Sequence, residues 1–234
     1  MMYFAIDIFS VYGAFTRGLK MAHSNILEKF PPAPRSIWSG VPDEKWNDWK
    51  WQLQNKIKRI EELEKAITVT EEEKDAFLKT DSIFHMGITP YYASLMDGKD
   101  TNCPIRLQAV PHPSELLRYE DELEDPLGEE KDMPVPGITH RYPDRVLFYI
   151  TPNCPVFCRH CTRKRKVSDP STAANDAQID EGIRYIAGNG KVRDVVISGG
   201  DPLSFSDAKL ESILSRLREI PHVEIIRIGT RNPP

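Results

Sequence analysis

Three cysteines stand close together in the chain and are the residues with the clearest capacity for chemistry. Cys154, Cys158 and Cys161 have the spacing Cys-x-x-x-Cys-x-x-Cys and follow an apolar run. Cysteine thiolates are the usual ligands of iron–sulfur clusters, so three at this spacing can share one cluster. Three ligands leave one iron without a protein partner, and such an open position is typical of a catalytic metal.

A zinc site is the main alternative for these cysteines. Structural zinc sites usually combine two closely spaced pairs of ligands, but the remaining cysteine, Cys103, lies far upstream. We expect Cys103 to be a buried free thiol. Disulfides are disfavoured, because three neighbouring cysteines make a poor framework. The pattern therefore favours a cluster over zinc.

Composition restricts the class of protein. The 234 residues include 31 Lys and Arg against 35 Asp and Glu, and 40% are hydrophobic. This balance indicates a globular chain rather than a disordered one. The formal net charge of -4 gives no support for a nucleic-acid or membrane-surface partner. Free clustered thiols favour a cytoplasmic location, where cysteines stay reduced.

The N-terminal segment resembles neither a signal peptide nor a membrane span. Residues 1–15 are apolar, but they lack a basic start and contain Asp7. The proline-rich residues 30–35 then exclude a continuous helix. One hypothesis is that translation starts at Met21.

Residues 43–96 are expected to be mainly helical. Apolar residues at three- and four-residue steps predict one helix over 43–67. A capping box opens a second helix over 70–78, and a third is expected over 88–96. Prolines and acidic residues then predict an extended, loop-rich strap over 97–140.

The pattern changes to alternating strands and helices after residue 145. Strands are predicted over 146–150, 194–198 and 224–228, with helices over 179–186 and 207–219. Such alternation predicts an α/β fold with right-handed crossovers and a parallel sheet. Ligand sites in such folds lie at the carboxyl ends of the strands.

Polar motifs follow each predicted strand. The cysteines follow the first strand, the Ser198–Asp201 segment the second, and Arg231 the third. Gly199 and Gly200 would let the backbone approach a ligand closely, and Asp201 alternatively caps the next turn. We therefore expect these motifs to gather at one edge of the sheet.

Four segments together resemble the lysine 2,3-aminomutase family of radical S-adenosylmethionine (SAM) enzymes. They are Thr139–Arg145, Cys158–Arg165, Asp194–Leu203 and Arg218–Arg231, and the similarity extends over about 41–234. Several motifs in the family's order are more specific than the cysteine triad alone.

The resemblance implies a fold and a division of the chain. An N-terminal helical region would precede the first half of a TIM-like partial (β/α)6 barrel. Residues 1–36 are an unassigned extension, 37–140 the helical and loop-rich region, and 141–234 a radical SAM core that is incomplete at its C-terminus. Because half a barrel would expose a sheet edge, we expect an N-terminal fragment that is inactive alone.

The resemblance also implies three cofactors. A 4Fe–4S cluster would be held by the three cysteines, and SAM would chelate the fourth iron. His160 would lie beside SAM, and Ser198, Gly199, Gly200 and Asp201 would receive its amino group. Arg141, Tyr142 and Arg145 would hold pyridoxal 5′-phosphate (PLP), and Arg163 would bind the α-carboxylate of the substrate.

The implied reaction is conversion of L-lysine to β-lysine, in which a radical derived from SAM moves the amino group from carbon 2 to carbon 3. It would require an external electron donor, and the full-length protein would be a homo-oligomer. No catalytic residue is assigned, because the family's PLP-anchoring lysine would lie beyond residue 234. The alternatives are glutamate 2,3-aminomutase, a radical SAM enzyme without PLP, and a non-catalytic iron–sulfur-binding remnant.

Overall fold

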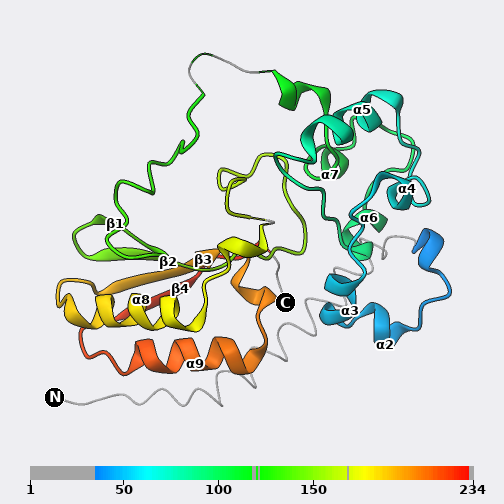
Figure 1. Cartoon of the computed structure of the whole chain (residues 1–234). Helices are drawn as coiled ribbons and strands as arrows, with labels where there is room; N and C mark the ends of the chain where they lie inside the picture. Colours follow the sequence, from blue (N-terminus) through cyan, green and yellow to red (C-terminus); the bar gives the residue numbers. More distant parts are fainter. Residues whose placement is uncertain (1–34, 118–119, 121, 168, 232–234) are drawn as a thin grey trace.

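The computed structural model describes residues 35–231, except 118, 119, 121 and 168. The expectations for residues 1–34, including the start at Met21, lie outside this range. Figure 1 shows two parts, a group of short N-terminal helices and an α/β part whose sheet carries the C-terminal half of the chain.

A four-stranded sheet forms the centre of the α/β part. Strands β2, β3 and β4 are parallel to one another, whereas β1 pairs antiparallel with β2. Helices α8 and α9 lie along one face of this sheet (Figure 1). The bounds are β1 Ile138–Tyr142, β2 Arg145–Thr151, α8 Asp176–Gly188, β3 Asp194–Gly199, α9 Asp207–Arg218 and β4 Ile225–Ile228.

The three predicted strands and both helices are confirmed, but the sheet is mixed rather than parallel. The sequence analysis assigned residues 138–142 to loop-rich and pre-strand segments, whereas they form β1. The tight connection between β1 and β2 makes this pair a hairpin, which can only be antiparallel. The predicted boundary between residues 140 and 141 falls within β1. The partial barrel remains a prediction.

Local sequence explains how α8 packs against the sheet. Asn175 and Gln178 form a capping box that satisfies free amides at the start of α8. Gly182 then lets the helix approach closely, because an added Cβ would lie 2.6 Å from the Phe148 ring. Apolar side chains of the helices and strands bury one another there to form the larger core.

The single helix predicted over 43–67 is wrong. The segment is divided into α2 (Asp43–Trp46), α3 (Trp49–Gln54) and α4 (Ile60–Leu63). Ile57 instead forms an antiparallel bridge with Ile88, which requires an extended backbone between α3 and α4. Its side chain is still buried, so the apolar pattern identified a core position but the wrong local structure.

The other expectations for the N-terminal helices are mainly confirmed. Helix α5 (Glu71–Thr80) begins with the predicted capping box, and α6 (Pro90–Ser94) has proline in its first turn. The strap also contains α7 (Pro104–Leu107), and its Cys103 is a buried free thiol as expected. The remaining short helices are η1 Ser36–Trp38, η2 Pro113–Leu116, η3 Pro170–Thr172 and η4 Pro202–Ser204.

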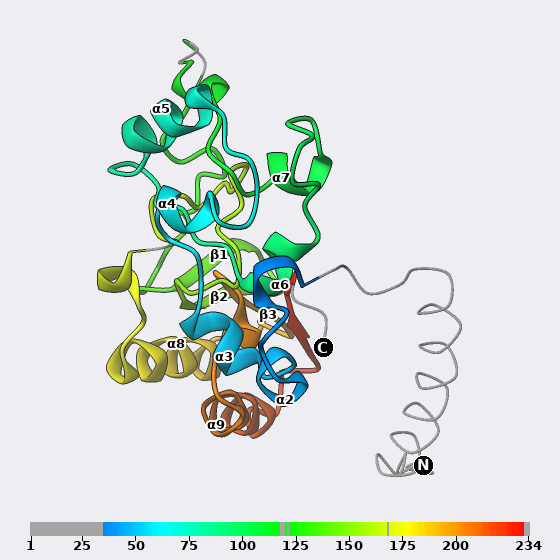
Figure 2. The same cartoon turned by 90° about the vertical axis from the view of Figure 1, so that its right-hand side faces the viewer.

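A small apolar cluster connects the N-terminal helices to the loop after β2. Phe84 from the N-terminal part packs with Phe157 and Val167, and Cys154 and Cys161 contact the same cluster. In Figure 2 the N-terminal helices lie beside the sheet and extend past it. The cysteine-bearing loop, residues 152–167, therefore lies between the two larger cores.

Among the residues that the structure describes, none of the helices combines the length and apolar character needed to cross a bilayer.

Candidate functional site

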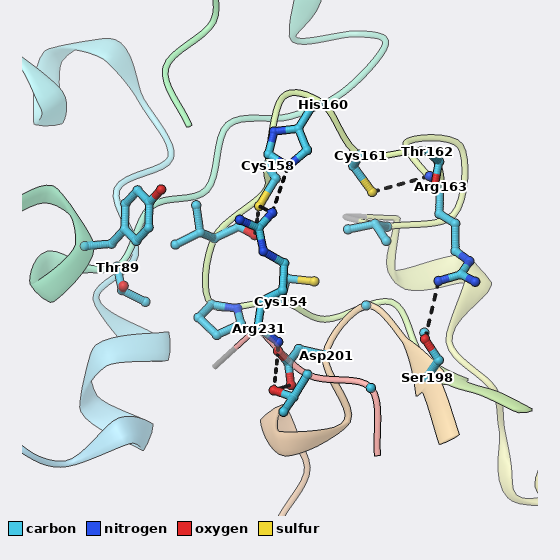
Figure 3. Close-up of a pocket in the computed structure, with 18 of the residues that line it drawn as sticks. Thr89, Cys154, Cys158, His160, Cys161, Thr162, Arg163, Ser198, Asp201 and Arg231 are labelled. Carbon is cyan, nitrogen blue, oxygen red and sulfur yellow. Dashed lines mark hydrogen bonds between the residues drawn. The ribbon is translucent and has the colours of Figure 1, made fainter. Parts of the chain in front are cut away.

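A cavity of about 780 Å³ opens at the carboxyl ends of the parallel strands. Its walls come from the cysteine loop, from the segments that follow β3 and β4, and from α6 of the N-terminal part (Figure 3). The sequence analysis expected the first three of these to gather at one edge of the sheet, and this is confirmed. The contribution of α6 was not predicted.

All three clustered cysteines line this cavity as free thiols. Figure 3 shows the sulfur atoms of Cys154, Cys158 and Cys161 around one part of it. Burial, with a smaller contribution from the Asp201 carboxylate, raises the pKa of the Cys154 thiol to about 12. Burial also raises the pKa of Cys158. A metal that binds here must therefore displace the thiol protons.

The residue types at this edge fit an iron–sulfur cluster, because three free cysteines line one cavity. Within the described residues, no three His, Cys, Asp or Glu side chains are grouped closely enough to hold one metal ion. A zinc site needs four ligands around the same ion, at about 2.0 to 2.3 Å. Cysteines that hold a 4Fe–4S cluster bind different irons, so their sulfur atoms stand farther apart.

Arg159, which lies between two of the cysteines, fastens their loop to the N-terminal part. Its side chain is 5% exposed, and Nε donates to both carboxylate oxygens of Glu115 at 2.9 and 3.1 Å. Nη1 donates to the carbonyl oxygens of Phe84 and His85. The backbone amide of Arg159 donates to the carbonyl oxygen of Gln108. The N-terminal part thus holds the loop in its observed conformation.

Two further contacts join the same parts. The amide of Phe157 donates to the carbonyl oxygen of Gly87 at 2.8 Å, and an added Cβ at Gly87 would overlap the Phe157 ring. Lys56 Nζ donates to the carbonyl oxygen of Cys154 at 3.0 Å. Burial, with a smaller contribution from Lys58, lowers the pKa of Lys56 to about 8.

The glycines after β3 permit a close backbone contact with the start of the cysteine loop. The amide of Gly200 donates to the carbonyl oxygen of Thr151 at 2.5 Å. Gly199 has φ +149°, and an added Cβ there would overlap the backbone of Thr151 at the end of β2, whereas one at Gly200 would overlap the backbone of Pro152 and Asn153 in the cysteine loop. Both positions therefore require glycine. Here the backbone partner is the chain itself, although both residues also line the cavity.

Asp201 links three segments of the site. Its carboxylate accepts from the Leu203 amide at 3.0 Å, which confirms the alternative that it caps the next turn. It also accepts from Thr230 Oγ1 at 2.8 Å and from the Arg231 amide at 3.0 Å, so it connects the ends of β3 and β4. A contact of Asp201 with SAM remains a prediction.

Arg231 enters the cavity from the end of β4 and reaches the cysteine loop (Figure 3). Its Nη1 lies 3.3 Å from Cys158 Sγ and 2.8 Å from His160 Nε2, and its Nη2 donates to Gln108 Oε1 at 2.9 Å. His160 lines the same cavity. The sequence analysis noted Arg231 at a strand end but did not include it among the site residues.

Arg163 lines the cavity but already contacts a carboxylate of this chain. Its Nε and Nη2 donate to Glu129, the shortest of these bonds being 2.6 Å, and its Nη1 donates to Ser198 Oγ at 3.3 Å. Glu129 is 8% exposed and belongs to the predicted strap. The pairing leaves the Nη1 edge of Arg163 as the edge available to a second carboxylate.

The three residues expected to bind PLP do not line this cavity. Arg145 begins β2, about 20 Å along the strand from the cysteine loop, and pairs with Asp194 at 2.7 Å. Arg141 lies at the end of β1 and pairs with Asp132, while Tyr142 is exposed beside it. The structure therefore does not bring this group together with the cysteines, and its role remains a prediction.

Several cavity residues had no signal of their own in the sequence. Thr89, Tyr91, Tyr92 and Leu95 come from α6 and its two caps, more than fifty residues before the cysteines. A polar residue at a strand end is a usable signal and identifies Thr230 and Arg231. The α6 residues reach the site only through packing of the N-terminal part.

Comparisons with known proteins agree with this geometry. Residues 148–233 match the family model described as the Radical SAM superfamily. An L-lysine 2,3-aminomutase of Methanococcus maripaludis is 55% identical over 205 residues, which cover 85% of this chain and 47% of the relative. That of Acetoanaerobium sticklandii is 53% identical over 197 residues, or 84% of this chain and 48% of the relative.

A relative that is named for a different reaction is also similar to this chain. A glutamate 2,3-aminomutase of Clostridioides difficile is 45% identical over 196 residues, which cover 84% of this chain and 46% of the relative. The chain spans about half the length of the curated relatives it matches.

Proposed function

Because the chain belongs to the lysine 2,3-aminomutase family of radical SAM enzymes, we propose that it forms the cluster- and SAM-binding part of an enzyme that converts L-lysine to β-lysine. The observation that carries this proposal is the convergence of three free cysteines on one cavity at the carboxyl ends of parallel strands. In folds of this class, ligands bind at that edge.

The cofactors of this family supply the reactive chemistry when they are bound: the reduced 4Fe–4S cluster and SAM provide a radical, and PLP stabilises the migrating nitrogen. The residues of this chain would bind the cofactors and the substrate and hold them in position. Cys154, Cys158 and Cys161 would hold the cluster in this cavity, one wall of which comes from α6. His160 and the Ser198–Asp201 segment border the space assigned to SAM.

Arg163 is the proposed ligand of the substrate carboxylate. Arginine suits this role, because its planar guanidinium donates parallel hydrogen bonds to a carboxylate. Glu129 holds one edge of the guanidinium, and the other edge remains for the substrate. Arg141, Tyr142 and Arg145 are proposed to hold PLP, although they lie on a different part of the sheet from the cysteines.

Lysine is the proposed substrate, because relatives named L-lysine 2,3-aminomutase without qualification are 48 to 55% identical to this chain, whereas the glutamate enzyme is 45% identical. The glutamate 2,3-aminomutase reaction is the second candidate. An assay of the full-length protein with L-lysine and with L-glutamate distinguishes the two reactions. An external electron donor, a cytoplasmic location and a homo-oligomeric full-length protein are further parts of this proposal.

The test is anaerobic reconstitution of the 234-residue chain with iron and sulfide. We expect about four irons and four sulfides per chain, and an electron paramagnetic resonance (EPR) signal of the reduced cluster that changes when SAM is added. Absence of a cluster would overturn the proposal. Cluster formation without any effect of SAM, and without 5′-deoxyadenosine, would instead favour a non-catalytic iron–sulfur protein.

The chain by itself is proposed to lack aminomutase turnover, because no PLP-anchoring lysine is assigned within it. Incubation of the reconstituted chain with SAM, PLP, a reductant and L-lysine tests this point. Formation of β-lysine would contradict it and would place all necessary residues within the 234 residues.

A further inference from the structure

Lys56 is a basic residue of the N-terminal part that reaches the first cysteine of the candidate site. Its Nζ donates to the carbonyl oxygen of Cys154 at 3.0 Å across 98 residues of sequence. The same ammonium lies 4.6 Å from the ring centroid of Phe157, in a cation–π contact. Both partners belong to the cysteine loop, so Lys56 contacts this loop at two points.

The local backbone explains why this side chain points toward the loop. Lys56 precedes Ile57, which pairs with Ile88 through two backbone hydrogen bonds of 2.8 and 3.0 Å. Side chains alternate along an extended segment, so the buried Ile57 directs Lys56 and Lys58 away from the N-terminal core. Lys58 is exposed, whereas Lys56 is partly buried against the cysteine loop.

The positive charge of Lys56 lies beside the loop without a neutralising carboxylate. In the described part of the chain, Arg159 pairs with Glu115, Arg163 with Glu129, and Arg165 with Asp125 and Glu130, whereas no ion pair involves Lys56. A partly buried charge is weakly screened, so its effect on a nearby charged group is larger than at the surface.

We propose that Lys56 is a positioning residue of the cluster site, which holds the Cys154 end of the cysteine loop and raises the reduction potential of a bound cluster. This inference rests on the proposed function, because it requires a cluster on the three cysteines. Through Lys56, the N-terminal part would influence reduction of the cluster in addition to packing against the cysteine loop.

The effect on the potential follows from charge. Reduction adds one electron from an external reductant to the cluster and makes it more negative by one unit. A nearby cation stabilises the more negative state, and hydrogen bonds and net charge around a cluster set its potential. Loss of the Lys56 charge is therefore expected to make the cluster harder to reduce.

The test compares Lys56→Met, Lys56→Arg and Lys58→Met in the anaerobically reconstituted 234-residue chain. Met preserves much of the length of the side chain without its charge, and Arg preserves the charge. The readouts are iron and sulfide content, the EPR spectrum of the reduced cluster, and its midpoint potential in a titration with dithionite at pH 7. Lys58→Met is the matched control, because it removes the same charge two residues away on the same side of the segment.

We expect Lys56→Met to shift the midpoint potential to more negative values, Lys56→Arg to restore it, and Lys58→Met to leave it near the wild-type value. Loss of the cluster in Lys56→Met alone, with recovery in Lys56→Arg, also supports the positioning role. Equal potentials in all variants, or equal loss of cluster in the Lys56→Met and Lys58→Met variants, would overturn the inference. A wild-type chain that takes up no cluster would instead overturn the proposed function.

Discussion

The two ends of the parallel strands are built from polar residues, but these residues are used differently. At the amino ends, the fully buried Asp194 pairs with Arg145 and Arg227, and Arg193 pairs with Glu224. The charges there neutralise one another within the fold. At the carboxyl ends, thiols, amides and a guanidinium surround a cavity.

This difference separates charges that are paired within the fold from groups that line the cavity at the other end of the same sheet. Residues whose polar groups are satisfied by neighbours stabilise the fold, and their loss should lower the free energy of unfolding. Residues that line a cavity offer groups to a ligand, and their loss should reduce binding with less effect on folding. Substitutions at the carboxyl ends should therefore reduce cluster binding most strongly, and those at the amino ends should mainly reduce stability.

Replacement of Cys158 by Ala should abolish the cluster. Two remaining cysteines cannot supply the three-ligand set, so we expect little bound iron and no EPR signal after reconstitution. The melting temperature of the metal-free chain should change little. Cys103→Ala, which removes a thiol outside the site, is the control and should retain the cluster. A normal cluster in Cys158→Ala would contradict the proposal that the three cysteines bind it at this edge of the sheet.

Replacement of Gly200 by Ala should affect both binding and folding. The added Cβ would overlap the backbone of the cysteine loop, and such overpacking typically costs about 1 to 3 kcal/mol. We expect a lower free energy of unfolding in urea and several-fold less cluster.

Gly190→Ala is the matched control for Gly200, because a Cβ there meets no atom within 4 Å. If both variants bind the cluster equally well, the close contact of the β3 loop with the cysteine loop is unnecessary for the site.

Replacement of Asp194 by Asn should reduce stability without loss of the cluster. It removes the charge from two hydrogen-bonded ion pairs, but Arg145 and Arg227 are partly exposed, so water can compensate them. We expect a loss of about 1 to 3 kcal/mol in urea unfolding. Asp180→Asn, in the exposed pair with Arg216, should cost less than about 1 kcal/mol. A large loss of cluster in Asp194→Asn would break the separation of the two ends.

The pH dependence of stability provides a smaller and independent test. Burial alone would raise the pKa of Asp194, but hydrogen bonds from Arg145 and Arg227 outweigh it and lower the pKa. The stabilisation is therefore complete above the unfolded pKa of about 3.9 and is lost as pH falls toward the lower folded pKa. Wild type should lose free energy of unfolding more steeply below about pH 4 than Asp194→Asn. Parallel pH profiles would contradict the assigned cause.

The order of strands and helices after residue 145 was predictable, because each element carries its own periodicity. The mixed sheet was not, because β1 is polar at its exposed end and shows no apolar run. The helix predicted over 43–67 failed for a related reason. Apolar spacing reports which residues are buried, and Ile57 is buried in a bridge to Ile88 rather than in a helix.

Some features of the candidate site were likewise predictable from the sequence, and others were not. The spacing of Cys154, Cys158 and Cys161 predicted their chemistry, and the strand ends predicted that the Gly199–Asp201 segment would lie beside them. No local pattern indicated that Glu129 would pair with Arg163, or that Lys56 would contact Cys154. These contacts join segments that are 34 and 98 residues apart.

The sequence by itself predicted a set of three thiol ligands, and it determined the order of the strands after residue 145 and the edge of the sheet at which the polar motifs lie. These properties depend on side-chain chemistry and on periodicity, which are local. Tertiary structure alone decided which charges are neutralised, which N-terminal residues form the wall of the cavity, and how the cysteine loop is held. These depend on distances between segments far apart in the chain, which are set only when the two cores pack around that loop.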